Sequence, residues 1–278
     1  MAHPSPPERS WLDPWTVGAI AVVAYAASNL VHEGLGHGGA CLLVGGRPEE
    51  LNAVFFECSV EGLPSAARRW LAAGGSIANL IVAGLAWMGV RRLPREWGRG
   101  RQFAWLMLAV NLLQPFGYLL FSGLGGLGDW AVVIEGMRPA VAWRLGLTAL
   151  GAVLYFVLTP PFLMAELEPF LGAGVEMRLA RVRTLTLLPY LVGGTLFVLA
   201  GLLNPHGLQL VLISAAAASF GGTSLLAWYP ALWARRRPGG PEPPLGVGRS
   251  VAWIIVSVVV VGLFVGVLGP GVRVSASG

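Results

Sequence analysis

The sequence predicts an all-α polytopic membrane protein, with about seven transmembrane helices and a small β-hairpin at the membrane surface after the first helix. Its 278 residues are 55% hydrophobic and only 12% charged, which is too apolar for a soluble domain of this length. Apolar runs of roughly 20 residues, long enough to cross a bilayer, recur along the chain. Such runs are expected to be helical, because helices satisfy their own backbone hydrogen bonds in lipid.

The pattern divides the chain into five parts. Residues 1–13 are polar and Pro-rich, which favours a flexible segment, and residues 14–137 form a membrane core with the candidate chemistry. Further transmembrane helices fill 138–234, a Pro- and Gly-rich flexible linker covers 235–249, and 250–278 hold a last transmembrane helix and a tail. The seven expected spans lie at about 14–44, 69–90, 102–122, 140–165, 184–203, 208–230 and 251–269.

Residues 45–64 break the apolar pattern after the first span. They mix Gly, Pro and Glu with the β-prone run 53–56, which predicts the hairpin. Cys41 and Cys58 are the only cysteines. They are too few for a disulfide framework and are not spaced like zinc ligands, so we expect no role for either.

The charge distribution predicts an orientation. The net charge is +5, and all 19 basic residues are arginine. The basic loops 91–101, 166–183 and 231–249 are separated by two spans each, so all three can lie on one side, which the positive-inside rule makes cytoplasmic. The amino terminus would then be inside and the hairpin outside. We expect a multi-pass protein of the bacterial plasma membrane that contacts lipid and binds no nucleic acid, and its oligomeric state is left open.

Three titratable residues lie inside the first span: His32, Glu33 and His37. The spacing H-E-x-x-x-H is one residue longer than H-E-x-x-H, whose histidines share a helix face at i and i+4. The extra residue adds roughly 100° of rotation, which Gly34 and Gly36 could absorb through a π-bulge. The histidines would then bind Zn²⁺, with Glu33 as general base. The competing interpretation is two buried histidines that bond to their neighbours.

A catalytic zinc site also needs a third protein ligand. Asp13 and Asp129 are the two aspartates of the chain, and Asp13 precedes the membrane. Asp129 follows a Gly-rich break in an apolar stretch, where an unpaired carboxylate is costly. We therefore expect Asp129 to be the third ligand, although it could also cap the short helix that begins there. Glu135 is the main competitor.

Together these features resemble the site-2 protease family of intramembrane zinc metalloproteases, over about residues 14–137. The stretch AAGGSIANLIVAG at 72–84 is similar to the family's Ala-Gly-Pro-x-x-Asn segment. NLLQPFGY at 111–118 is similar to the start of its Asn-x-x-Pro…Asp-Gly segment. The resemblance implies that zinc is held by His32, His37 and Asp129, and that Glu33 activates water.

The resemblance also implies that Asn79 and Asn111 position an unwound substrate helix or stabilise an oxyanion, although hydrogen bonding between helices explains them equally well. The chain departs from the family in three ways. Its histidine spacing is longer, and 18 residues separate Asn111 from Asp129 where the family is compact. Family members also usually place the site toward the cytoplasm, whereas the charge pattern predicts the outside.

We therefore expect an enzyme, a zinc metalloendopeptidase that hydrolyses peptide bonds of single-span membrane protein substrates. The alternative is a non-proteolytic, protease-like membrane protein that binds metal or client helices, and the intact Glu33 argues against it. A zinc peptidase with a Glu-x-x-x-Asp ligand pair would need glutamate where Gly125 stands. His206, in the turn NPHG, is expected to be a loop residue.

Overall fold

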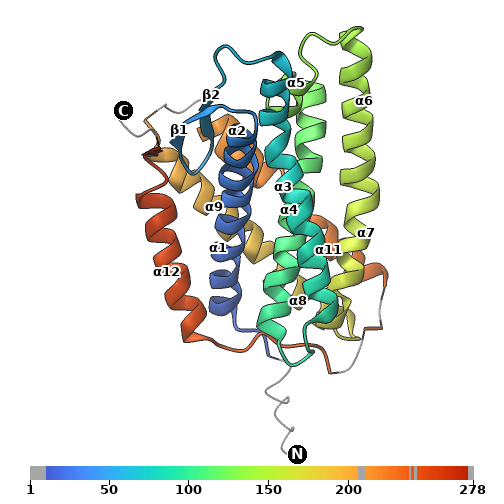
Figure 1. Ribbon diagram of the computed structural model, residues 1–278. Helices are drawn as coiled ribbons and strands as arrows, with labels where there is room; N and C mark the ends of the chain where they lie inside the picture. The colour runs from blue at the N-terminus through green and yellow to red at the C-terminus, as the bar shows by residue number, and fades with distance from the viewer. Residues whose placement is uncertain (1–10, 206–210, 238, 241–242, 275–278) are drawn as a thin grey trace, which may run out of the picture.

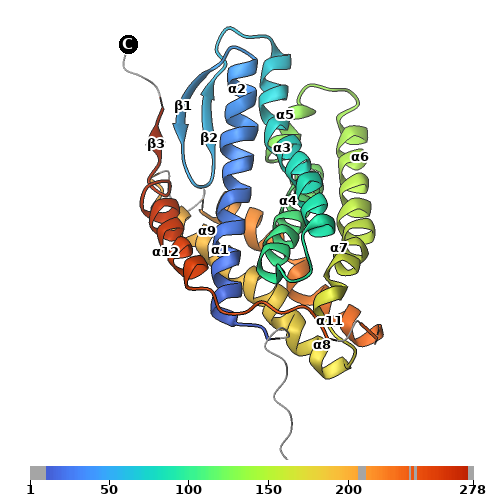
Figure 2. The ribbon, with the colours of Figure 1, turned by 60° about the horizontal axis from the view of Figure 1, so that its bottom comes forward.

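The protein is a bundle of long helices with a small sheet at one end (Figures 1 and 2). This computed structural model describes residues 11–205, 211–237, 239–240 and 243–274, and it is mostly helical, at 73%. We call the end that carries the sheet the hairpin end, and the opposite end, where residues 11–13 lie, the amino-terminal end. His206 and most of the amino-terminal segment fall outside the described residues.

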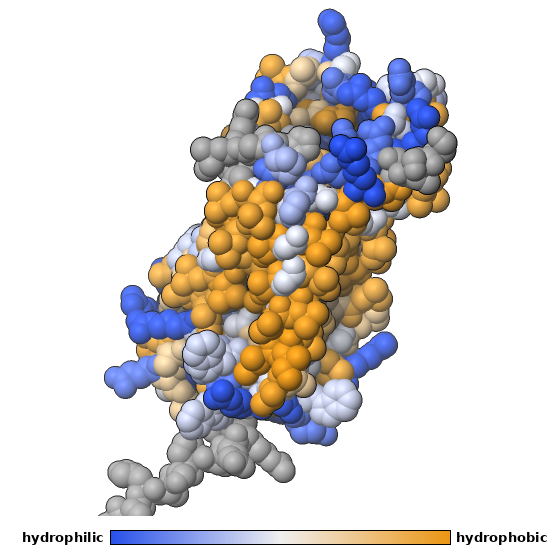
Figure 3. Space-filling model, turned by 90° about the vertical axis from the view of Figure 1, so that its left-hand side faces the viewer, coloured by the Kyte–Doolittle hydropathy of each residue, from blue (hydrophilic) through white to orange (hydrophobic). Residues whose placement is uncertain are grey.

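Five helices within the described ranges are long and apolar enough to cross a membrane: Pro14–Leu43, Ser65–Arg92, Gly98–Gly125, Ala140–Phe170 and Val175–Leu202. The expected count of seven is therefore not confirmed. The last expected span is the helix α12, Val251–Gly266, which has only 16 residues, and part of the sixth lies outside the described residues. Figure 3 shows a broad apolar belt between two polar ends, as expected for a membrane protein.

The first span is one continuous helix with three parts: α1 (Pro14–Leu30), the π-helical segment η2 (Val31–Gly38) and α2 (Gly39–Leu43). It begins with an ordinary cap, because Asp13 Oδ2 accepts a hydrogen bond of 2.9 Å from the Thr16 backbone N–H. Proline follows at the first helical position, where its missing N–H costs nothing. Asp13 is thus accounted for as a cap at the amino-terminal end.

The expected hairpin is confirmed. Strands β1 (Arg47–Leu51) and β2 (Phe56–Ser59) pair antiparallel, and a third strand from the end of the chain, β3 (Val272–Arg273), joins β1 on its other side. The expectation for the cysteines was wrong, because Cys41 and Cys58 form a disulfide. The hairpin folds back over the end of the first span and brings two residues 17 positions apart to a Cα–Cα distance of 6.1 Å, which suits a disulfide.

The core of the bundle is built around α4 (Gly98–Gly125), which packs against α1 and against α3 (Ser65–Arg92). Trp105 of α4 is fully buried, and its indole N–H donates to the Leu163 carbonyl oxygen at 2.9 Å. The helix is capped by Gly126, whose φ of 68° is left-handed and favours glycine. The short helix α5 (Asp129–Val133) follows and lies against α3.

The helices of the rest of the chain pack around this core. The described helical segments of this part are α6 (Ala140–Ala152), η3 (Val153–Leu158), α7 (Thr159–Leu167), η4 (Glu168–Phe170), α8 (Val175–Val182), η5 (Arg183–Leu187), α9 (Leu188–Leu202), η6 (Val211–Gly221) and α11 (Leu225–Arg236). At the amino-terminal end the buried Arg178 donates to both carboxylate oxygens of Glu168, at 2.9 and 2.7 Å. The expected basic loop 166–183 is therefore largely helical, and the Arg178–Glu168 ion pair links its two parts.

Backbone hydrogen bonds attach the carboxyl-terminal part of 235–249 to the bundle. Leu245 N–H donates to Pro169 O at 2.9 Å, and Val247 N–H donates to Trp11 O at 2.8 Å. Asp13 N–H in turn donates to Val247 O at 2.8 Å. The expected flexibility of this linker stays a prediction, and the structure shows what holds one half of it.

Candidate metal centre

The π-helical segment η2 explains the long spacing between the two histidines. In an α-helix, residues five apart point in different directions, but a π-helix closes its hydrogen bonds from i to i+5. His32 and His37 both lie in η2, and their ring centroids are 4.8 Å apart. The π-bulge that the glycines allow is therefore present, as a segment of eight residues.

The third candidate ligand comes from α5. Asp129 is the first residue of that helix, its side chain makes no capping bond, and the cap position is Gly128. Its Oδ2 instead lies 3.2 Å from His32 Nε2 and 3.5 Å from His37 Nε2. Glu135, the competing carboxylate, lies away from the histidines, because it is exposed and pairs with Arg68 at 3.5 Å.

The three ligand atoms form a triangle of the size that zinc requires. The remaining side, between the two Nε2 atoms, measures 3.2 Å. Ligand atoms about 2.0–2.1 Å from a tetrahedral zinc lie about 3.3 Å from one another. All three sides of the triangle match this value within about 0.2 Å, so one zinc ion fits the residues that are present.

Proton positions favour the same conclusion. His37 Nδ1 lies 2.8 Å from the Leu71 carbonyl oxygen, and that oxygen can only accept a hydrogen bond, so Nδ1 carries a proton and Nε2 has the lone pair in the neutral ring. Without metal, a single proton on His32 Nε2 cannot serve both His37 Nε2 and Asp129 Oδ2, each of which lies 3.2 Å away. A cation between the three atoms would satisfy all of them at once.

The electrostatics of Asp129 suit a ligand. Burial alone would raise the pKa of its carboxyl group, but the neighbouring imidazoles of His32 and His37 outweigh burial and hold that pKa below its usual range. The carboxylate is therefore ionised at neutral pH. An ionised oxygen is the form that binds a metal ion.

Glu33 lies beside this cluster and is buried, with 6% of its surface exposed. It lines a small cavity together with His32, so the glutamate and one candidate ligand open onto the same space. The backbone of Phe56 in β2 lies next to its carboxylate. The hairpin therefore packs over Glu33 at the hairpin end of the bundle.

Small residues let α3 approach the cluster closely. A Cβ atom added at Gly75 would lie 2.6 Å from His32 Nε2 and 2.7 Å from His37 Nε2. Gly36 and Gly74 press against each other in the same way. Ser76 of α3 accepts a hydrogen bond of 3.1 Å from the Trp130 indole N–H, which fixes α5, and with it Asp129, against α3.

The two asparagines singled out in the sequence bond between helices. Asn111 donates to Ser28 Oγ at 2.7 Å, and Asn79 approaches Gln114 Oε1 at 3.5 Å. The side-chain oxygens of both asparagines are buried without a partner. Their expected role in holding substrate stays a prediction.

Sequence reasoning missed three side chains that share the small cavity: Asn29, Gln114 and Tyr118. The Tyr118 ring lies 5.6 Å from the His32 ring, measured between centroids. A signal existed for Asn29, because it lies three and four positions before His32 and Glu33 and therefore shares their helix face. Nothing in the sequence distinguishes Tyr118 from an ordinary aromatic residue of a membrane helix.

Comparison with known proteins identifies no relative of this chain: no family model, no curated protein and no solved structure matches it.

Proposed function

We propose that this protein is an intramembrane zinc metallopeptidase that cleaves single-span membrane proteins, as its resemblance to the site-2 protease family implies. One observation carries the proposal: ligand atoms of His32, His37 and Asp129 all lie within 4.8 Å of one another. Their triangle has the dimensions of a zinc site, and the buried Glu33 is next to it.

A zinc ion bound there would polarise the scissile carbonyl group and make a water molecule acidic near neutral pH. Glu33 accepts a proton from that water as the water oxygen attacks the carbonyl carbon. Glu33 then delivers the proton to the leaving amine when the C–N bond breaks. His37 is held in the binding tautomer by Leu71 O. The α3 contacts of Trp130 hold Asp129 in place.

The surroundings of the cluster favour a membrane-embedded substrate. His32, Glu33 and His37 lie within the first span, and the hairpin places the backbone of Phe56 next to Glu33. A peptide bond that reaches Glu33 must therefore belong to a chain that is itself in or at the bilayer. It must also be locally unwound, because the carbonyl group of a helix is already hydrogen-bonded.

The first test is zinc content per chain in detergent-purified protein. We expect one zinc in wild type, and at least about a tenfold loss of affinity in His37→Ala and Asp129→Asn. Glu135→Gln is the matched control, because it removes a carboxylate of the same segment that lies outside the cluster. A folded wild type that binds no zinc would overturn the proposal.

The second test separates catalysis from binding. Glu33→Gln should keep its zinc and lose cleavage of reconstituted single-span peptides by about 10²–10⁴-fold, because only the base is removed. Mass spectrometry of the products would locate the cut. If wild type binds zinc but cleaves no peptide faster than Glu33→Gln does, the peptidase proposal is refuted. The alternative, a protein that binds metal or client helices without cutting them, would then hold.

A further inference from the structure

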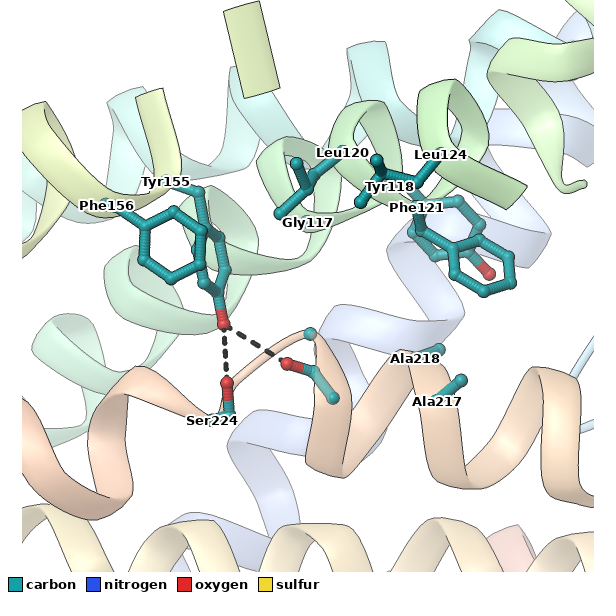
Figure 4. Close-up of a pocket in the computed structure, with 12 residues that line it drawn as sticks. Gly117, Tyr118, Leu120, Phe121, Leu124, Tyr155, Phe156, Ala217, Ala218 and Ser224 are labelled. Atoms are coloured by element: carbon teal, nitrogen blue, oxygen red, sulfur yellow. Dashed lines mark hydrogen bonds between the residues drawn. The ribbon is translucent and has the colours of Figure 1, made fainter. Parts of the chain in front are cut away.

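A second, larger cavity lies next to the candidate metal centre (Figure 4). Its volume is about 290 Å³. Its walls are the carboxyl-terminal part of α4, the segment η3 and the segment η6, and they are mostly apolar. One of its polar groups, the Tyr155 hydroxyl, is already bonded, at 3.2 Å to Gly221 O and at 3.1 Å to Ser224 Oγ. The cavity is therefore suited to an apolar group.

The two cavities share a wall. Tyr118 and Ala218 line the large cavity and also the small cavity that contains His32 and Glu33. Figure 4 shows Tyr118 and Tyr155 at opposite sides of the large cavity. A group in the large cavity is therefore separated from the small cavity, and from His32 and Glu33, by only these two side chains.

The rim of the large cavity faces the lipid. Leu124 and Phe156, which line it, are 64% and 49% exposed, and both belong to helices that can span the membrane. Exposed apolar side chains on such helices are expected to contact lipid chains. An occupant can therefore enter sideways from the bilayer.

Polar groups near the cluster indicate that the occupant is a peptide and not a lipid chain. Asn29 is 5% exposed, and its Oδ1 is buried without a partner. The Tyr118 hydroxyl likewise has no hydrogen-bond partner among the described residues. An unwound peptide in lipid needs partners for its N–H and C=O groups. Asn29 Oδ1 can accept a hydrogen bond from a peptide N–H, and the Tyr118 hydroxyl can donate one to a peptide C=O. An acyl chain would leave both unsatisfied.

We propose that the large cavity receives one bulky apolar side chain of a membrane peptide whose backbone lies between Asn29 and Tyr118 at the metal centre. This assignment rests on the proposed function for its substrate class, and it makes the cavity the specificity pocket of the site. A bulky side chain fills the space, whereas alanine leaves it empty and forgoes the gain from burying apolar surface.

The experiment measures binding of labelled single-span peptides to the zinc-loaded Glu33→Gln protein, which cannot cleave them. The peptides have an Ala-rich centre that carries Phe at one of several successive positions, or Ala throughout. Ala217→Phe fills the large cavity without touching the small one. Ala216→Phe is the matched control, because it makes the same change one residue away, outside the cavity. Gly221→Leu is a second filling variant, since an added Cβ atom there meets nothing within 4 Å.

We expect at least one Phe peptide to bind about tenfold more tightly than the Ala peptide, a usual discrimination for an apolar pocket. Ala217→Phe and Gly221→Leu should abolish this preference at unchanged zinc content, and Ala216→Phe should keep it. A preference that survives both filling variants, or no preference at any position, would overturn the assignment.

Cleavage of the same peptides by the protein with Glu33 intact separates this assignment from the proposed function. A pocket-dependent preference without cleavage would support the cavity and refute the peptidase. Cleavage without any preference would refute the cavity and keep the peptidase. Neither binding nor cleavage would overturn both.

Discussion

Gly75 is a residue at which the packing of the candidate site can be tested directly. It lies on α3 opposite both histidines, and a Cβ atom there would come within 2.6–2.7 Å of their Nε2 atoms. Real Cβ atoms do not approach so closely, so alanine must push the rings or the helix aside. The triangle of ligand atoms would then lose its dimensions.

We predict that Gly75→Ala lowers zinc affinity by about 10–100-fold, the usual effect of disturbing the support of a metal ligand. Competition with a chelator of known affinity measures the change. Gly84→Ala is the control on the same helix, because an added Cβ atom there meets nothing within 4 Å. Equal zinc affinity in both variants would mean that the rings do not pack against α3 as described.

Among single residues, the sequence predicted those whose titratable side chains are unusual in a membrane helix. His32, His37 and Asp129 are rare titratable groups in apolar surroundings, and the structure brings them together. Asn29 was overlooked although it shares the helix face of His32 and Glu33, and Tyr118 was overlooked because nothing in the sequence distinguishes it from an ordinary aromatic residue of a membrane helix. The Cys41–Cys58 pair escaped because its proximity depends on how the hairpin folds back.

Among the elements, η2 is the one whose geometry follows most directly from sequence. The extra residue between the histidines and the flanking glycines predict a local departure from α-helix, since no regular α-helix would align them. Most helices were also located within a few residues. The strand β3 was not predicted, because two residues carry no periodic signal and its pairing with β1 is a tertiary contact.

The hairpin gives a prediction for an element. The disulfide closes a loop of 17 residues between α2 and β2, which restricts the unfolded chain. We expect the combined change Cys41→Ala and Cys58→Ala to lower the free energy of unfolding by about 3 kcal/mol. Zinc content should stay at the wild-type value, because no candidate ligand is altered.

Denaturant unfolding of the detergent-purified protein measures this change. Wild type treated with a reductant should resemble the double variant, and the double variant itself should not respond to reductant. If wild type also unfolds at the same denaturant concentration with and without reductant, the two cysteines do not form a stabilising bond.

The whole molecule shows where the charges and the cluster lie relative to each other. The loop between α3 and α4, the helix α8 and the segment after α11 gather at the amino-terminal end (Figure 1). These are the three basic regions of the sequence. The cluster, the hairpin and the disulfide lie toward the opposite end. The count of seven spans is not confirmed at this scale, because α12 has only 16 residues and part of the sixth expected span lies outside the described residues.

Two independent observations therefore predict that the hairpin end lies outside the cytoplasm. Arginine-rich loops stay on the cytoplasmic side, and disulfides persist in oxidising compartments. The observations involve different residues at opposite ends, and they agree. The candidate site would then open toward the outer face, unlike the usual arrangement in the family that the sequence resembles.

Labelling of single introduced cysteines in intact cells tests this orientation. Glu61→Cys, in the exposed turn after β2, should react with a membrane-impermeant maleimide, whereas Glu96→Cys, in the exposed loop between α3 and α4, should react only after lysis. The native pair should stay unlabelled without reductant, because both sulfurs are bonded. The reverse labelling pattern would place the hairpin end in the cytoplasm and would contradict this orientation. The disulfide would then face a reducing compartment, and the two cysteines should be reduced in cells.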